Sequence, residues 1–140
     1  MHQLLFIMWQ ESNNTGITLI DDQHRGIVSI INTFYYLVSI KCNPKMYLQL
    51  IDTIYNYSVI HFMAEEGILK TYEYKNIDHH KELHKKLLLE MDRIKRSLMK
   101  DNDPKPLLDF LKKWWIGHIN NEDKQYAPMV LAGTPKIPSL

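Results

Sequence analysis

Histidine, glutamate and aspartate side chains recur along this chain at spacings that suit a metal site built on helices. The residues concerned are His24, His61, Glu65, His80, His84, His118 and Asp123. A carboxylate can bridge two metal ions through its two oxygens, and neutral imidazole binds iron as well as zinc, copper and nickel. Five imidazoles with two carboxylates therefore favour a pair of redox-active metal ions over a single structural zinc ion.

Two of the pairs have the spacing of neighbours on one helix face. His61 and Glu65 are four residues apart, and so are His80 and His84. Side chains separated by four positions lie one above the other on the same side of an α-helix. Each of these two segments can therefore present two ligands to one centre.

The pair His118 and Asp123 has a different spacing, because its members are five residues apart. On a regular α-helix this separation leaves the two side chains about 140° out of register. If both are to reach one centre, the helix must end, bulge or otherwise turn between them. The sequence alone leaves these three possibilities open.

Each histidine taken singly also has a structural interpretation, because a histidine on an apolar helix face is often a hydrogen-bonded core residue. The joint pattern favours metal binding, since a core with five unpaired imidazoles and two carboxylates would be costly to bury without a cation. The other two histidines, His2 near the terminus and His79 about 100° around the helix from His80, are assigned no role.

Four amphipathic segments are predicted to position the candidate ligands, because apolar residues recur at alternating steps of three and four. In chain order, the inward-facing positions are Ile20, His24, Ile27, Ile31, Phe34 and Val38; Leu50, Ile54, Tyr57, His61, Glu65 and Ile68; His80, His84, Leu87, Met91, Ile94 and Leu98; and Leu107, Leu111, Trp114 and His118. No alternating pattern competes as a sheet. The sequence predicts an all-α, antiparallel, up-down four-helix bundle with a di-iron centre in its core.

Length and composition predict a single domain over residues 1–140, with an N-terminal arm at about 1–16, the bundle at about 17–126 and a C-terminal tail at about 127–140. Lys and Arg number 17 against 16 for Asp and Glu, so we expect no nucleic-acid or membrane partner. The longest uncharged run, between Arg25 and Lys41, is shorter than the roughly 20 residues that span a bilayer. The start of the chain lacks the features of a signal peptide, and a lone Cys42 suits a reducing, cytoplasmic compartment.

Several motifs, in one order along the chain, resemble the hemerythrins, and more closely the single-domain bacterial hemerythrins. They are Gly16-Ile17 through Ile20-Asp21-Asp22-Gln23-His24, His61-Phe62-Met63-Ala64-Glu65-Glu66, Tyr74 followed by His80-Lys81-Glu82-Leu83-His84, and Trp114 with His118-Ile119 and Asp123-Lys124-Gln125-Tyr126. The resemblance extends from about Trp9 to Tyr126.

The resemblance implies two iron ions with unequal ligand sets. One iron would be held by His80, His84 and His118 and the other by His24 and His61, with Glu65, Asp123 and an oxo or hydroxo bridge shared between them. The first iron is then six-coordinate, whereas the second keeps one open position at which dioxygen can bind. The implied function is reversible, non-enzymatic dioxygen binding for storage, delivery or scavenging, and dioxygen is the one partner implied.

Four large apolar residues are expected around the open position, because they lie beside ligands or one turn away: Ile27, Phe62, Trp115 and Ile119. A bundle would bury such residues as core in any case. Trp115 departs from the family, in which an aliphatic residue is common three positions before the last histidine. A bulkier wall could narrow the site, or change water access and so alter autoxidation in either direction.

Polar neighbours of the ligands have two readings. Asp21, Gln23 and Glu66 could orient imidazoles, since a ligating histidine usually donates its second N–H to a nearby oxygen, or they could be solvated caps and surface charges. Lys124 and Tyr126 also belong to a family motif, but the sequence alone assigns no function to either residue.

Two other functions use the same scaffold. A di-iron oxidase, peroxidase or nitric oxide reductase is disfavoured because oxygen-activating sites are usually rich in carboxylates, with Glu-x-x-His pairs. An oxygen or iron sensor would normally be fused to an output domain, so here it would need a separate partner.

Overall fold

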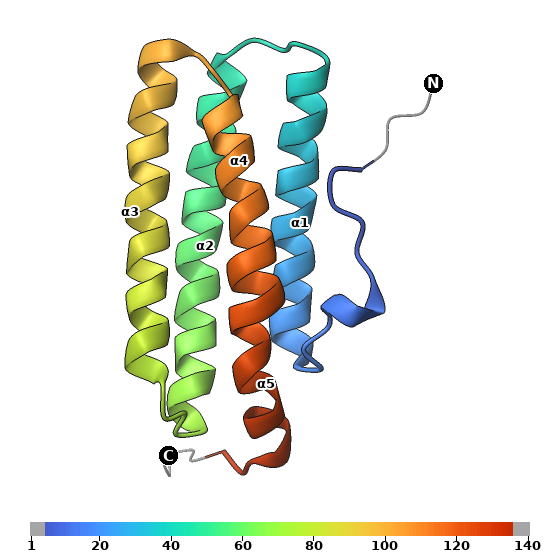
Figure 1. Cartoon of the computed structure of the whole chain (residues 1–140), viewed down its shortest axis with the longest axis vertical. Coiled ribbons are helices and arrows are strands. Elements are labelled where there is room, and N and C mark those ends of the chain that lie inside the picture. Colours follow the sequence, from blue (N-terminus) through green and yellow to red (C-terminus); the bar gives the residue numbers. More distant parts are fainter. Residues whose placement is uncertain (1–4, 136–140) are drawn as a thin grey trace.

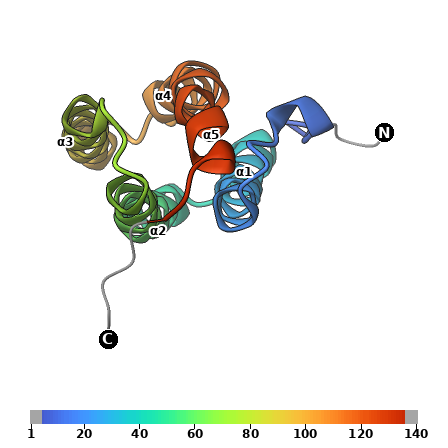
Figure 2. The same ribbon diagram turned by 90° about the horizontal axis from the view of Figure 1, so that it is seen from below.

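The protein is described by a computed structural model for residues 5–135, and these residues form four long helices arranged side by side (Figure 1). The first three are α1 (Thr18–Ser39), α2 (Lys45–Thr71) and α3 (Ile77–Asp101). The fourth is continuous but has three parts: α4 (Lys105–Lys113), η2 (Trp114–Glu122) and α5 (Asp123–Ala132). Viewed along their axes, the helices enclose a common core (Figure 2). The predicted all-α four-helix bundle is confirmed.

Short connections make neighbouring helices antiparallel. The α1–α2 and α3–α4 links each contain a non-glycine residue in the left-handed region, Lys41 at φ 53° and Asn102 at φ 53°, which ends the preceding helix. Asparagine and aspartate side chains then start the next helix, because Asn43 accepts a hydrogen bond from the Lys45 N–H at 3.0 Å. Asp103 does the same for Lys105 at 3.0 Å. None of the helices within residues 5–135 is both long enough and apolar enough to cross a membrane.

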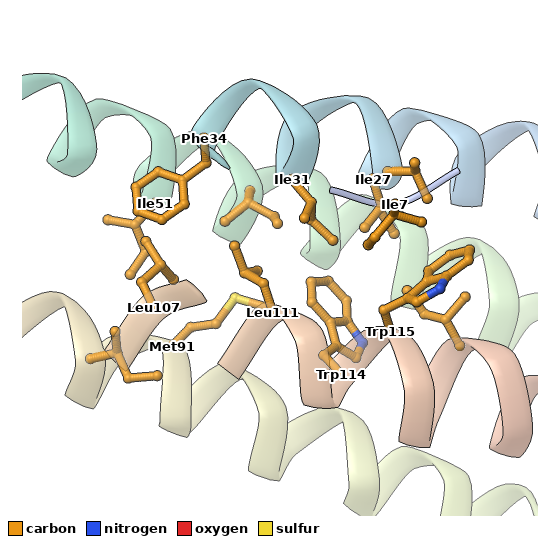
Figure 3. Close-up of a cluster of buried hydrophobic side chains, with 14 of the residues drawn as sticks. Ile7, Ile27, Ile31, Phe34, Ile51, Met91, Leu107, Leu111, Trp114 and Trp115 are labelled. Atoms are coloured by element: carbon orange, nitrogen blue, oxygen red, sulfur yellow. The ribbon is translucent and has the colours of Figure 1, made fainter. Parts of the chain in front are cut away.

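The inward positions form one apolar core along most of the bundle (Figure 3). Its most deeply buried members come from all four helices and include Ile27, Ile31, Phe34, Ile51, Ile54, Met91, Leu107, Leu111 and Trp114. Burying one such side chain fully is worth about 1.5–3 kcal/mol. The apolar stripes therefore supply the packing that holds the polar ligand positions in the same interior.

The fourth helix is longer than the predicted bundle boundary at about residue 126. Helix α5 continues to Ala132, because Ala127 and Val130 are buried and Val130 packs in a small cluster with Leu69 and Tyr126. Residues 127–132, assigned to the tail from the sequence, are helical in the structure. The last part of the expected tail, residues 136–140, lies outside the described residues.

The N-terminal arm packs across α1 and the fourth helix. The Asn32 amide makes two hydrogen bonds to the backbone of Ile7, accepting from the N–H at 2.8 Å and donating to the carbonyl at 2.9 Å. At the end of a short 3₁₀ turn, η1 (Glu11–Asn13), the Asn13 amide donates to the side-chain oxygen of Asn120 at 2.9 Å. The arm thus links α1 to η2 and buries Ile7 against the core.

Candidate metal centre

All seven candidate ligands meet at one place inside the bundle. They come from all four helices, with His24 on α1, His61 and Glu65 on α2, His80 and His84 on α3, and His118 and Asp123 on the fourth helix. Every one of them is buried. His2 lies outside the described residues, and His79 is exposed to solvent. The structure therefore separates the candidate ligands from the other histidines as the helical stripes predict.

The ligand atoms fall into two overlapping groups. One contains Glu65, His80, His84, His118 and Asp123, the other contains His24, His61, Glu65 and Asp123, and within each group the atoms lie within 4.8 Å of one another. The two carboxylates belong to both groups. The chain's own geometry thus gives two adjacent positions, one facing three imidazoles and one facing two.

Glu65 divides its oxygens between the two groups. Its Oε1 contacts Nε2 of His80 and lies 3.2 Å from Nε2 of His84. Its Oε2 lies 3.2 Å from Nε2 of His61 and 4.0 Å from Nε2 of His24. Such a carboxylate is oriented as a bridge between two cations.

Asp123 divides its oxygens in the same way. Its Oδ1 lies 3.1 Å from Nε2 of His80 and 3.0 Å from Nε2 of His118. Its Oδ2 lies 3.0 Å from Nε2 of His24. Both carboxylates therefore present one oxygen to the three-histidine group and the other to the two-histidine group.

A π-helix resolves the spacing problem between His118 and Asp123. The segment η2 has π-helical geometry throughout, and the Asp123 N–H donates to the His118 carbonyl. A hydrogen bond from residue i+5 to residue i brings side chains five apart toward the same face, which a regular α-helix cannot do. Of the three possibilities left open by the sequence, the structure shows the bulge, extended over about two turns of helix.

The charges in the centre are strongly coupled. Burial alone would raise the pKa of the Glu65 carboxyl, but the neighbouring imidazoles of His61, His80 and His84 outweigh it and hold the pKa well below its ordinary value. Burial and the nearby Glu65 charge raise the pKa of Asp123, yet His118 and His24 lower it further, so the net shift is also downward. Burial lowers the pKa of His80, whereas both carboxylates raise it, with a net result of about 10. The two carboxylates are thus ionised and require positive charge beside them.

The donor set also fits a metal because several of its atoms lack hydrogen bonds. Among residues 5–135, the buried ligand atoms without a hydrogen-bond partner are Nε2 of His24, His61 and His118, Oε2 of Glu65, and both carboxylate oxygens of Asp123. Buried polar atoms of this kind are costly when unsatisfied. Two cations would satisfy them together, and imidazole nitrogen with carboxylate oxygen is a donor set that suits iron.

Two of the three polar neighbours orient imidazoles. The Gln23 side-chain oxygen lies 2.7 Å from Nδ1 of His61, and the Glu66 carboxylate lies 2.8 Å from Nδ1 of His84. Each contact directs the other nitrogen, Nε2, to the centre. Asp21 has a different task. It accepts hydrogen bonds from the Thr15 and Gly16 N–H groups at 2.7 and 3.0 Å, and so fixes the segment that leads into α1 against the first turn of that helix.

Tyr126 is a neighbour of the centre to which the sequence reasoning gave no task. Its side chain is fully buried, packs edge to face on His80 at 5.5 Å between ring centroids, and has no hydrogen-bond partner for its hydroxyl within the described chain. Burial, and then the charge of Glu65, raise its pKa, so the phenol remains protonated. Its spacing of three from Asp123 places it on the same helix face, which is the signal that could have identified it.

The four predicted pocket residues are all buried. Phe62 stacks on His84 with 3.8 Å between centroids and lies 5.7 Å from His61, so its ring contacts both groups. Trp115 lies 5.8 Å from Trp9 of the arm, and Figure 3 shows it beside Ile7 and Ile27. Ile27 and Ile119 belong to the same core cluster. The arm therefore covers Trp115.

Comparisons with known proteins agree with this architecture. Residues 15–130 match the family described as Hemerythrin HHE cation binding domain. The chain is 28% identical over 125 residues to bacteriohemerythrin of Pseudomonas paraeruginosa, covering 89% of this chain and 81% of the relative. It is 28% identical over 119 residues to myohemerythrin-1 of Phascolopsis gouldii, covering 85% of this chain and 90% of that protein.

A crystal structure of wild-type hemerythrin superimposes with a TM-score of 0.80 over 91% of this chain and 99% of that chain, at 24% sequence identity. This likeness concerns the fold. The family match covers most of the chain, including every candidate ligand. The chain therefore belongs to the hemerythrin family.

Proposed function

We propose that the protein binds dioxygen reversibly at a pair of iron ions and acts as a non-enzymatic oxygen carrier, store or scavenger in the cytoplasm. The observation that carries the proposal is the unequal division of the ligand atoms, with three imidazoles facing one position and two facing the other across shared carboxylates. Relatives named bacteriohemerythrin and myohemerythrin support the same function.

Each group of side chains has a defined task in the proposal. His80, His84 and His118 would hold one iron, and His24 and His61 the other, with Glu65 and Asp123 bridging. Two ferrous ions held there would supply the two electrons that dioxygen takes up on binding. The smaller histidine set would leave room for an exogenous ligand on the two-histidine side.

Reversibility depends on keeping water and acids out of the site. The two-histidine side is closed by tight packing of α1 on α2, because a Cβ added at Gly26 would lie 2.2 Å from the Tyr57 hydroxyl. That hydroxyl donates to the Gln23 carbonyl at 3.2 Å, which holds the backbone next to His24. Nδ1 of His61, which points away from the centre, contacts the side chain of Gln23, and this side chain is a neutral amide that does not ionise. These residues hold the backbone beside His24 in place, and none of them is a carboxylic acid or a charged donor.

The proposal is tested by loading the purified protein with ferrous iron in the absence of air, counting the metal and cycling oxygen. We expect two irons per chain and a peroxide-to-iron charge-transfer absorption that appears with oxygen and disappears on its removal over several cycles. If the absorption decays to an oxidised form that requires fresh reductant in each cycle, the protein consumes oxygen and is an enzyme. If no iron binds, the metal assignment itself is wrong.

A further inference from the structure

A groove on the outer surface between α3 and the fourth helix reaches the candidate metal centre. It has a volume of about 380 Å³, and its walls are apolar side chains of Leu83 and Leu87 on α3 and of Phe110 and Trp114 on the fourth helix. His118 also lines it. The two cavities next to the N-terminal arm, by contrast, contain none of the seven candidate ligands.

His118 is the most accessible of these ligands. Its exposure is 6%, whereas the other six are at most 3% exposed. Its Nε2 faces the centre and is fully buried, so the accessible part of the imidazole is the opposite edge. Beside it, a Cβ added at Gly117 would meet no atom within 4 Å, so the adjoining part of the groove is open. The groove thus exposes the edge of a ring whose other edge faces the proposed iron.

The position of the groove argues against oxygen as its ligand. His118 belongs to the three-histidine group. In the proposed function, three imidazoles, two carboxylates and a shared bridge would fill the coordination of the iron held there. A small molecule in the groove therefore finds no vacant coordination position. Electron transfer needs no vacancy, because it proceeds through a ligand ring that lies between the donor and the metal.

We propose that this groove binds a flat, anionic aromatic reductant of the reduced flavin nucleotide class, which passes electrons to the iron pair through the His118 imidazole. The inference rests on the proposed function, since it concerns the recovery of the same iron pair after autoxidation. It assigns His118 a second task, as the electron path, in addition to metal binding.

The dimensions and charges of the groove select this kind of ligand. Its volume is within the range of about 300–1,000 Å³ that is usual for small-molecule sites. Phe110, which is half-buried, offers aromatic surface for stacking, and Lys86 and Lys113 stand at the rim, where they can bind a phosphate.

Two acidic residues, Glu90 and Glu122, also lie at the rim. Glu90 is engaged by Arg93, whose Nε donates to its carboxylate at 2.9 Å, and the charge of Lys113 also lowers the pKa of Glu90. Lys86 is therefore the lysine of this rim on which a ligand phosphate depends most.

The reaction balances with the flavin as the only added reductant. The reduced flavin loses two electrons and two protons and becomes the oxidised flavin. Each of two ferric ions gains one electron and becomes ferrous. One proton converts the oxo bridge to a hydroxo bridge, and the other leaves to solvent.

Binding is tested with oxidised flavin mononucleotide and the oxidised protein, between which no electrons can pass, by quenching of flavin fluorescence. Gly117→Leu fills the groove, and we expect it to weaken binding at least tenfold. Gly67→Leu is the matched control, because Gly67 is also a helical glycine whose added Cβ meets nothing within 4 Å. Equal binding by Gly117→Leu and the parent, or equal loss in both variants, overturns the proposal.

Electron transfer is tested by mixing oxidised protein with reduced flavin mononucleotide without air and following the loss of the ferric absorption. We expect the rate to saturate with flavin concentration in the parent and to fall at least tenfold in Gly117→Leu, at unchanged iron content. The pair Lys86→Glu with Lys113→Glu should weaken binding of flavin mononucleotide but leave that of riboflavin, which has no phosphate, unchanged. A rate that rises linearly and is the same in all variants overturns the proposal.

The two proposals fail separately. Loss of iron or of reversible oxygen binding in the parent contradicts the proposed function, while flavin binding in the groove is still measured by fluorescence. Normal oxygen cycling without saturable flavin binding contradicts this inference alone.

Discussion

Two glycines on opposite sides of the candidate metal centre have opposite surroundings. An added Cβ at Gly26, on the two-histidine side, would overlap the Tyr57 hydroxyl at 2.2 Å, whereas one at Gly117, on the three-histidine side, would meet nothing within 4 Å. The first side is closed by helix contact, and the second is open as far as His118. The packing is thus tightest on the side where an exogenous ligand is proposed to bind, and most open on the side where the proposed coordination is complete.

Removing one ligand from each side should have the largest effect. His118→Ala and His24→Ala are each expected to lower iron content below two per chain and to destabilise the bundle by several kcal/mol, because metal binding stabilises only the folded state. Iron analysis and thermal unfolding measure both effects. Since the proposed site has three histidines for one iron and two for the other, His24→Ala should reduce the affinity for the iron on its side by a larger share. Parent-like iron content in both variants would rule out the metal assignment.

The residues that orient the imidazoles provide a second comparison. Glu66→Ala and Gln23→Ala should weaken iron binding by about 10–100-fold, the usual cost of removing a hydrogen-bond partner of a ligating histidine. Glu66 is charged and Gln23 is neutral, so we expect the larger loss at Glu66. Competition with a chelator measures the affinity. A larger loss in Gln23→Ala would show that packing, and not charge, governs the two contacts.

Substituting each of the two glycines by alanine compares the packing on the two sides directly. Gly26→Ala should destabilise the protein by about 1–3 kcal/mol, because Tyr57 must move and its hydrogen bond to Gln23 is lost. Gly117→Ala should be neutral or stabilising, by up to about 1 kcal/mol, since alanine favours a helix over glycine. Denaturant unfolding checks both values. Similar effects at the two sites would remove the contrast in packing on which this comparison rests.

The smallest expected effect concerns the arm. Trp9 contacts Trp115 and lies beneath the Arg25 guanidinium, which is 4.8 Å from the ring centroid. Trp9→Ala should loosen this cover and accelerate autoxidation about tenfold, which corresponds to ~1.4 kcal/mol in the barrier. The decay of the oxygenated absorption measures the rate. Tyr36→Ala serves as a control. Tyr36 is an exposed aromatic residue that lines the same surface cavity as Trp9 and Arg25, and its removal should leave the rate unchanged.

Sequence periodicity was sufficient to predict the four helices, because the inner face of each is marked by apolar residues and by the ligands themselves. It could not choose between a helix end and a bulge at His118 and Asp123, since that choice depends on contacts of the whole segment with three other helices. The position of the N-terminal arm could not be predicted either, because it depends on hydrogen bonds between Ile7 and Asn32, which are 25 residues apart in the sequence. The helical state of residues 127–132 depends on burial of Val130 against Leu69, another distant contact.

The π-helix also has a consequence for the phase of the fourth helix. Leu107 and Leu111 before it, and Trp114 and His118 in its first half, follow each other at intervals of four, three and four, and after it Asp123, Tyr126 and Val130 follow at three and four. The five-residue interval between the two series holds one residue more than a regular helix turn would. The segment therefore works as a phase shift, which lets two regular stretches, each in its own register, face the same interior.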